Sequence, residues 1–212
     1  MTTLRVIEIY ASIQGESTRA GLPCTFVRLA GCPLRCRWCD TVYSFSGGEP
    51  MTIDEITDEI DGHGIGLIEL TGGEPLAQPG APELLRVLCD RYSQVLLETS
   101  GSFPIEELDP RVGVIMDMKA PGSGEESRNL WQNLEHLKAG DELKIVISDR
   151  TDYDWAREVV ETHRPEVPVL FSPVFGELEP SQLSEWMLAD RLAVRMQLQQ
   201  HKYIWDPEAR RT

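Results

Sequence analysis

The sequence predicts an α/β fold with a mainly parallel sheet or barrel, left incomplete because only about six to eight strands are expected. Short β-branched apolar runs alternate with amphipathic segments along the chain, and this alternation is typical of parallel α/β sheets. Polar and glycine-rich stretches follow several of these runs, at the ends of strands where such folds build their active face. The length of 212 residues favours a single domain spanning residues 1–212.

The individual elements follow from local composition and from start and stop signals. Strands are expected where β-branched and aromatic residues concentrate, at 6–10, 25–29, 67–70, 95–97, 112–116, 143–147, 167–171 and 193–198. Helical spacing is present at 52–60, 82–92, 152–163 and 181–189, and more weakly at 129–137. Thr52 and Glu55 form the pattern of a capping box at the first of these helices, and Pro82 fits the first turn of the second.

Composition excludes several classes of function. The net charge is −15, with 20 Lys and Arg against 35 Asp and Glu. Since nucleic-acid binding needs a basic face and the chain has no basic cluster, we expect no nucleic-acid partner. No apolar run approaches the roughly 18 residues of a membrane span, so no membrane association is expected. The first residues lack the layout of a secretory signal, which predicts a cytoplasmic protein.

The chain has five cysteines, three of them in the pattern Cys-x3-Cys-x2-Cys at Cys32, Cys36 and Cys39. An odd number with this crowding favours metal ligation over a disulfide framework. A structural zinc site normally needs four ligands, usually in two pairs, and a ferredoxin-type cluster takes four cysteines. Cys24 and Cys89 lie in apolar segments and are expected to be small buried side chains. The triplet therefore predicts a metal centre with three protein thiolates.

Three thiolates on a four-iron cluster leave one iron without a protein ligand. That iron can chelate the amino and carboxylate groups of S-adenosylmethionine, whose reductive cleavage releases a 5′-deoxyadenosyl radical; the cofactor does the difficult chemistry and the protein orients it. Trp38 is expected to shield the cluster. The alternative is a zinc-binding interaction domain, with a fourth ligand from His136, His163 or His201.

A second motif, Thr71-Gly72-Gly73-Glu74-Pro75, follows a predicted strand. With the cysteine triplet it resembles the radical S-adenosylmethionine (SAM) superfamily, in which a Gly-Gly-Glu-Pro motif binds the amino group of the cofactor. Glycines leave their carbonyls open to such an ammonium, because no Cβ stands in the way. The resemblance implies an incomplete parallel β/α barrel of the radical SAM type.

Further segments resemble one family within that superfamily, the 7-carboxy-7-deazaguanine synthases; they are 13–17, 26–32, 39–41, 98–101 and 197–205. The resemblance implies conversion of 6-carboxy-5,6,7,8-tetrahydropterin to 7-carboxy-7-deazaguanine with loss of ammonia, in queuosine and 7-deazapurine biosynthesis. It also implies a 4Fe–4S cluster, SAM, magnesium, a homodimer and an electron donor such as flavodoxin or ferredoxin. A glycyl-radical-enzyme activase shares the triplet and the glycine motif, and is the rival interpretation among enzymes.

The resemblance also implies roles for individual residues. The cluster ligands are Cys32, Cys36 and Cys39, and Thr41 is a magnesium ligand. The substrate-binding residues are Ile13, Gln14, Gly15, Glu16, Arg28, Thr71 and Pro207. The cofactor-binding residues are Trp38, Cys39, Asp40, Gly73, Asp117, Met118, Lys119, Ser172, Pro173, Val174 and Phe175.

Two features depart from the family pattern, and no general base is assigned. Asp117-Met118-Lys119 stands where the family often has Ser-Pro-Lys. Some members end at a proline that reaches the substrate, whereas Pro207 is followed here by Glu208 to Thr212. A planar pterin carboxylate favours a paired contact from Arg28, while Gln14 and Glu16 suit the amide and amine edge of the ring.

Overall fold

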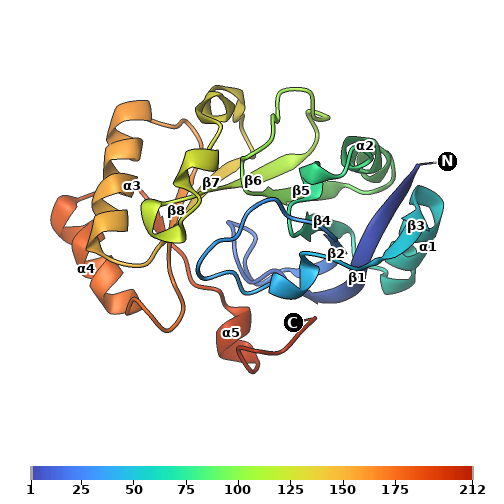
Figure 1. Cartoon of the computed structure of the whole chain (residues 1–212), viewed down its shortest axis with the longest axis horizontal. Coiled ribbons are helices and arrows are strands. Elements are labelled where there is room, and N and C mark those ends of the chain that lie inside the picture. The colour runs from blue at the N-terminus through green and yellow to red at the C-terminus, as the bar shows by residue number, and fades with distance from the viewer. Residues whose placement is uncertain (1, 212) are drawn as a thin grey trace.

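The computed structural model describes residues 2–211, whose strands form one nine-stranded sheet (Figure 1). The strands are β1 (Thr3–Ile13), β2 (Pro23–Leu29), β3 (Glu49–Thr52), β4 (Leu67–Gly72), β5 (Gln94–Thr99), β6 (Gly113–Met118), β7 (Glu142–Ile147), β8 (Val169–Pro173) and β9 (Arg195–Met196). The α-helices are α1 (Ile53–His63), α2 (Ala81–Arg91), α3 (Arg150–His163), α4 (Pro180–Asp190) and α5 (His201–Ile204).

The predicted incomplete parallel barrel is confirmed. The strand order is β3-β1-β2-β4-β5-β6-β7-β8-β9, and every pair from β2 to β9 is parallel. β1 pairs antiparallel with β2 and with β3. Within residues 2–211, β3 and β9 stay at opposite edges of the sheet, so the barrel does not close.

The barrel is also shortened, because two connections between its middle strands lack an α-helix. The described residues 100–112 join β5 to β6 without an α-helix, and short 3-10 turns, η3 (Pro121–Ser123), η4 (Glu126–Arg128) and η5 (Trp131–His136), join β6 to β7. The weak helical pattern at 129–137 therefore forms 3-10 helix rather than α-helix. Two elements were not predicted: β3, an edge strand of four residues, and α5, a single turn.

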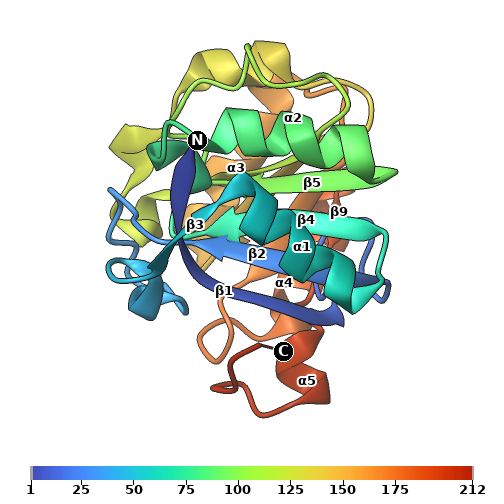
Figure 2. The same cartoon turned by 90° about the vertical axis from the view of Figure 1, so that its right-hand side faces the viewer.

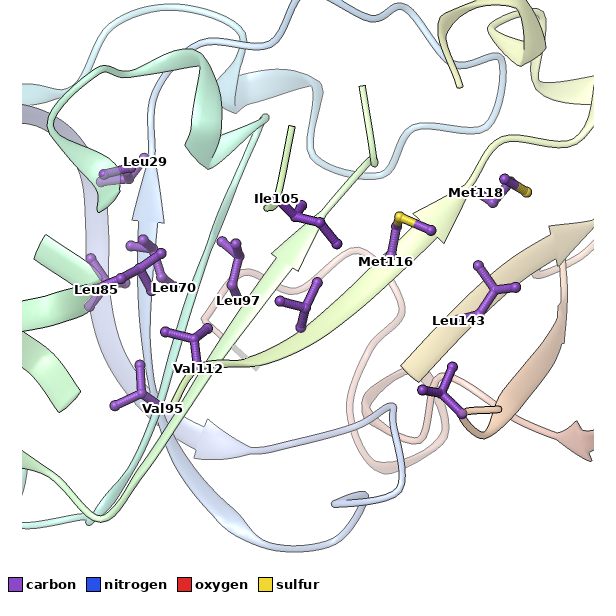
Figure 3. Packing of buried hydrophobic residues seen from close by; sticks show 14 of the residues in the cluster. Leu29, Leu70, Leu85, Val95, Leu97, Ile105, Val112, Met116, Met118 and Leu143 are labelled. Atoms are coloured by element: carbon purple, nitrogen blue, oxygen red, sulfur yellow. The ribbon is translucent and has the colours of Figure 1, made fainter. Parts of the chain in front are cut away.

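Helices α1 to α4 pack on the outer face of the sheet and enclose the main core (Figures 1 and 2). Alternate residues of adjacent strands supply this core, for example Leu70, Leu97 and Met116, each no more than 1% exposed (Figure 3). This is the period of two expected when one face of a strand packs against helices. Each outward position thus leaves its neighbour facing into the barrel, where the candidate site lies.

The inner face has a small apolar floor with a polar wall above it. Tyr10, Cys24, Phe26, Leu67, Leu96 and Ile115 form the floor as a separate buried cluster. Cys24 is fully buried, as predicted, and half-buried Cys89 packs against the main core. One step nearer the carboxyl ends of the strands, the inward positions become charged. No helix within residues 2–211 has the length and apolar character needed to cross a membrane.

The predicted capping box at the start of α1 is present. The Thr52 hydroxyl accepts a hydrogen bond from the Glu55 amide at 3.2 Å, and the Glu55 carboxylate accepts from the Thr52 amide at 2.8 Å. At the other end, Gly64 takes a left-handed conformation with φ of 67°. Both ends of α1 are therefore fixed by local sequence.

We expect Thr52→Ala to lower the free energy of unfolding by about 1 kcal/mol, because it removes the acceptor for an otherwise unpaired helical amide. Denaturant unfolding followed by circular dichroism measures this loss. Thr52→Ser keeps the hydroxyl and should retain most of the stability. A Ser variant as unstable as the Ala variant would contradict the capping role.

Candidate active site

A cavity of about 670 Å³ opens on the inner face of the barrel at the carboxyl ends of the strands. It is lined from β1, β2 and β4 to β8, from the cysteine-bearing loop after β2, and from the C-terminal segment. The volume lies within the range of small-molecule sites, and the position is where parallel α/β folds place catalysis.

The cysteine loop is held by backbone contacts with the loop after β6. The Arg37 amide donates to the Ser123 carbonyl at 3.0 Å, and the Arg35 amide donates to the Glu125 carboxylate at 2.5 Å. A turn then brings the Cys39 amide to the Cys36 carbonyl at 3.2 Å. The chain's own contacts thus define this loop without a metal.

All three thiols of the triplet are half-buried on the wall of this cavity. Burial raises the pKa of Cys32, and raises that of Cys36 to about 11, so ligation by their thiolates would release protons. Among residues 2–211, no group of three or more His, Cys, Asp or Glu converges on a point that could hold a single metal ion. Three thiols on the wall of one cavity suit the cysteine ligation of an iron–sulfur cluster.

The Gly-Gly-Glu-Pro segment lies directly against the start of the cysteine loop. The Gly73 amide donates to Leu29 and the Glu74 amide to Gly31, at 3.1 and 2.8 Å. A Cβ on Gly73 would lie 2.4 Å from the Gly31 carbonyl oxygen, and one on Gly72 would lie 2.5 Å from that of Leu29. Only glycine allows this approach, so the two motifs form one surface.

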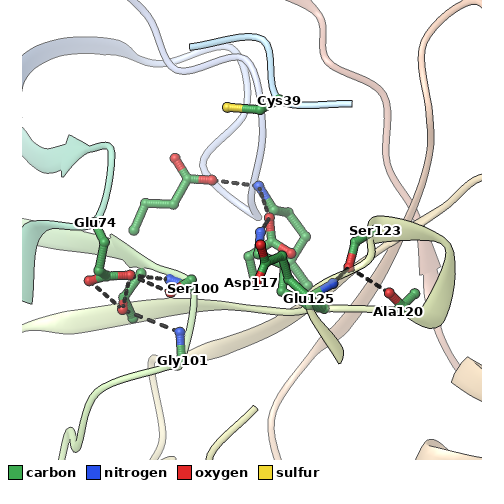
Figure 4. Close-up of polar contacts among 12 residues, drawn as sticks. Cys39, Glu74, Ser100, Gly101, Asp117, Ala120, Ser123 and Glu125 are labelled. Carbon is green, nitrogen blue, oxygen red and sulfur yellow. Dashed lines mark hydrogen bonds and ion pairs between the residues drawn. The ribbon is translucent and has the colours of Figure 1, made fainter. Parts of the chain in front are cut away.

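Glu74 is a structural residue of this motif. Its carboxylate is fully buried and accepts hydrogen bonds from the Leu76 amide at 2.9 Å, from the Thr99 hydroxyl at 2.9 and 3.0 Å, and from the Ser100 amide at 2.7 Å (Figure 4). These bonds join the loop after β4 to the Glu98-Thr99-Ser100-Gly101 segment after β5. The carboxylate thereby fixes two walls of the cavity relative to each other.

A buried ammonium organises the charged wall. Lys144 on β7 is 5% exposed and pairs with Glu16 at 2.8 Å, with Asp117 at 3.4 Å and with Glu98 in a short contact. Burial alone would lower the pKa of Lys144, but the Glu16 and Glu98 carboxylates raise it well above its usual value. Burial alone would raise the pKa of Glu16, but Lys144 lowers it to about 2. Both groups are therefore charged at neutral pH.

Glu69 on β4 is the exception to this pairing. It is 1% exposed, and burial together with the Glu98 charge raises its pKa to about 8. Its carboxyl accepts from the Gln14 side-chain nitrogen at 2.6 Å, while the Gln14 oxygen accepts from the Glu16 amide. Both ends of the Gln14 side-chain amide are used inside the protein, and its backbone N–H and carbonyl are bonded to Leu22 and Gly21, so Gln14 serves to orient Glu16.

The segment at 197–203 returns to the loop after β1. A Cβ on Gly15 would lie 2.4 Å from His201 Nδ1 and 3.1 Å from the His201 backbone nitrogen, so a larger residue at this position would require His201 to move. The Gln199 side-chain nitrogen donates to the Glu16 carboxylate at 2.9 Å, and Lys202 pairs with Asp40 at 3.1 Å. Two stretches far apart in sequence thus form one side of the cavity.

Arg28 lies on the cavity wall, as predicted, but much of its guanidinium is already bonded. It donates to Glu8 at 2.9 Å, to the Tyr10 hydroxyl at 3.0 Å and to the Gly72 carbonyl at 3.5 Å. Buried Glu8 neutralises its charge. A substrate carboxylate at this position would therefore share Arg28 with Glu8.

The structure brings most of the expected site residues to this one cavity. Those on its wall are Ile13, Gln14, Gly15, Glu16, Arg28, Cys32, Cys36, Trp38, Cys39, Asp40, Thr41, Thr71, Gly73, Asp117, Lys119, Ser172, Val174, Phe175 and Pro207. Met118 and Pro173 do not line it: Met118 points outward into the main core, 2% exposed, and Pro173 lines a smaller neighbouring pocket.

Asp117 stands where the family often has the serine of Ser-Pro-Lys. One carboxylate oxygen pairs with Lys119 at 3.1 Å and with Lys144, while the other is buried without a hydrogen-bond partner among residues 2–211. A buried unpaired acceptor is costly and suits a donor from a bound molecule. The side chain can thus supply an acceptor where the family often has serine.

Sequence reasoning assigned no role to Glu8, Glu69, Glu98 or Lys144. Each lies within a largely apolar strand at an inward position. A charged residue in such a strand was a usable signal, because charges are buried only when paired.

Three comparisons with known proteins bear on this site. The family model for the radical SAM superfamily matches residues 26–111. The chain is 51% identical to the 7-carboxy-7-deazaguanine synthase of Chlorobaculum tepidum, over 98% of this chain and 96% of the relative. It is 44% identical to that of Koribacter versatilis, over 98% and 99%. The crystal structure of QueE from Escherichia coli superposes with a TM-score of 0.77 at 22% identity, covering 94% of this chain and 95% of that one.

The structural likeness confirms the fold, and the sequence relatives favour the synthase interpretation over the activase and the zinc-binding domain. The match to the first of these relatives extends over nearly the whole chain. The chain belongs to the 7-carboxy-7-deazaguanine synthase family of the radical SAM superfamily.

Proposed function

We propose that this chain converts 6-carboxy-5,6,7,8-tetrahydropterin to 7-carboxy-7-deazaguanine with release of ammonia, as a carbon–nitrogen lyase of queuosine and 7-deazapurine biosynthesis. The observation that carries the proposal is the arrangement of one cavity. Three cysteine thiols, the Gly-Gly-Glu-Pro loop and a set of charged side chains suited to a heterocycle line the same space. Relatives named 7-carboxy-7-deazaguanine synthase, which match nearly the full chain, support it.

Membership of the radical SAM superfamily implies a 4Fe–4S cluster and SAM. When bound, they supply the radical that abstracts a hydrogen atom from the substrate. In the proposal Cys32, Cys36 and Cys39 hold the cluster. The SAM-binding residues are those named from the sequence, and all but two of them line the cavity. Those on the wall are Trp38, Cys39, Asp40, Gly73, Asp117, Lys119, Ser172, Val174 and Phe175. Met118 and Pro173 have side chains directed elsewhere, which leaves their backbone for this role.

The substrate end of the cavity suits a pterin. The ring presents amine and amide donors along one edge, and Glu16 is held ionised by Lys144 to accept them. Ile13, Gln14, Gly15 and Thr71 complete the proposed binding surface. Lys144 keeps the carboxylates of Glu16, Glu98 and Asp117 in place, since a buried ammonium restricts the geometry of its partners.

Magnesium, the electron donor and the assembly belong to the same proposal. The Thr41 hydroxyl lines the cavity 3.7 Å from the Cys39 sulfur. It would provide one oxygen ligand, with the substrate carboxylate and water supplying others, as magnesium prefers. A flavodoxin or ferredoxin would supply the electron. The protein would act as a cytoplasmic homodimer, in which the exposed apolar side chains of Leu188, Ile204 and Trp205 are available for burial.

An anaerobic assay with the carboxytetrahydropterin, SAM, reductant and magnesium tests the function. We expect 7-carboxy-7-deazaguanine and ammonia in equal amounts, with SAM recovered because the cofactor is regenerated in each cycle. Chromatography with mass detection identifies the product. A cluster-loaded protein that cleaves SAM but leaves the pterin unchanged would overturn the proposal.

We expect Cys36→Ala to abolish cluster binding and turnover together, because two thiolates cannot retain the cluster. The broad absorption at about 400 nm and the iron content measure the first effect, and product formation measures the second. Cys89→Ala, which alters a thiol packed against the core, is the matched control. Full iron content in the Cys36 variant would show that the triplet is not the ligand set.

We expect Glu69→Gln to become progressively more stable than the wild-type chain as the pH rises from about 5 to about 8. In the folded wild-type chain the Glu69 pKa is raised to about 8 from an ordinary 4.5. Its contribution to stability is therefore complete below the ordinary value and is lost as pH rises toward the folded value, by at most about 1.4 kcal/mol per pH unit.

The midpoint of thermal unfolding, measured across this pH range for both chains, checks the expectation. Glu158→Gln on the exposed side of α3 is the control for loss of one carboxylate. A difference between Glu69→Gln and wild type that stays constant with pH would show that Glu69 is ionised in the folded state.

A further inference from the structure

The C-terminal segment beyond α5 forms a wall of the cavity. Residues Pro207 to Arg211 all line it, although they follow the last helix and carry exposed side chains. Figure 1 shows this segment turning back from α5 towards the strands at the N-terminal side of the sheet. A tail placed by chance would have no reason to end against the cavity.

A local turn directs the segment to this position. The Asp206 carboxylate accepts from the Glu208 amide at 2.9 Å, and the Asp206 carbonyl accepts from the Ala209 amide at 2.9 Å. An aspartate that bonds the backbone two residues on is a sequence-encoded turn. Asp206 therefore sets the direction in which Arg210 and Arg211 point.

Both arginines reach side chains of the cavity's β1 and β2 side. The Arg210 guanidinium lies 4.0 Å from the centre of the Tyr43 ring, and Arg211 Nε is 3.4 Å from Glu8 Oε2. Glu8 also binds Arg28 at 2.9 Å and the Tyr43 hydroxyl at 2.9 Å. Arg28 and Arg211 thus pair with one buried carboxylate, Arg210 stacks on the tyrosine that donates to it, and the cluster carries a net positive charge.

Arg210 retains the donors that a ligand needs. It stacks on Tyr43, and within residues 2–211 no carboxylate or carbonyl accepts from it. A guanidinium held flat on an aromatic ring keeps its edge donors free for paired contacts with a carboxylate. Arg28, by contrast, is already bonded to Glu8, Tyr10 and Gly72.

We propose that the segment 206–211 is a binding strap whose Arg210, supported by Arg211, recognises the carboxylate of the substrate at the Tyr43 end of the cavity. This inference rests on the proposed function, since it takes the ligand to be a carboxylated pterin. Arg210 acts as a specificity-determining residue: it distinguishes a pterin that bears the carboxylate from one that lacks it, while the ring itself is read at the Glu16 end.

Calorimetric titration of the cluster-loaded enzyme with SAM and magnesium tests this. The two probes are pterin-6-carboxylate and unsubstituted pterin, which differ in the carboxylate alone. We expect Arg210→Gln to weaken binding of the carboxylate probe about tenfold, as for loss of a charge-assisted hydrogen bond, with little change for unsubstituted pterin. Arg86→Gln, an exposed arginine of α2, removes the same charge far from the cavity and should alter neither affinity.

Asp206→Ala separates positioning from charge. This change removes a negative charge, so long-range electrostatics alone would strengthen binding of an anion. If the turn positions the strap, the carboxylate probe binds more weakly instead, and that result supports the proposal. Stronger or unchanged binding to Asp206→Ala would overturn it, as would an unchanged ratio of the two affinities in Arg210→Gln.

Different results would overturn the proposed function and the binding strap. A wild-type enzyme that binds neither pterin would overturn the proposed function and the strap together. A wild-type enzyme that forms the deazapurine and binds the carboxylate probe, while Arg210→Gln discriminates between the two probes as well as wild type does, would overturn the strap alone. A raised KM with a largely unchanged kcat in Arg210→Gln would support recognition by the strap.

Discussion

The buried ammonium of Lys144 is the charge on which the inner face of the barrel depends. An unpaired ammonium at this depth would cost several kcal/mol, and Glu16, Glu98 and Asp117 offset that cost from three other elements. The same ion pairs fix the loop after β1, β5 and β6 relative to β7. A site built on strands of one sheet gains rigidity from hydrogen-bonded neighbours, and here one cation links the side chains across them. Glu69, left without a cation of its own, takes up a proton instead.

A second constraint is the close approach of two loops. Gly72 and Gly73 lie so near the backbone at Leu29 and Gly31 that no Cβ can be placed there. Glu74 then bonds the same loop to the segment after β5. The relative position of these loops is set by backbone hydrogen bonds and by one buried carboxylate. These contacts hold the cysteine loop against the charged wall.

The sequence predicted what depends on local pattern, and missed what depends on distant pairing. Alternation of strands and helices gave the open parallel barrel, and the cysteine and glycine motifs gave the cavity, since both lie at strand ends. The same period of two that identifies strands would have shown that Met118 faces the core between Asp117 and Lys119. Lys144 and Glu16 are 128 positions apart, and no local pattern connects them. For the same reason the pairing of Arg28 with Glu8 was not foreseen, and the short β3 and α5 have too few residues to show a period.

The distribution of charge explains why one end of the cavity needs arginines from the tail. The chain carries −15 overall, yet six basic and seven acidic side chains line the cavity, and neutral Glu69 brings them into balance at pH 7. The excess negative charge is therefore spread over the rest of the surface. Such a field favours approach of SAM, which has a sulfonium and an ammonium against one carboxylate, and it disfavours a pterin carboxylate. A local cationic cluster must then supply the attraction that the whole molecule lacks. Because Glu8 already neutralises Arg28, the available cations at that end come from the residues beyond Pro207, which extend the chain to the place where the anion would lie.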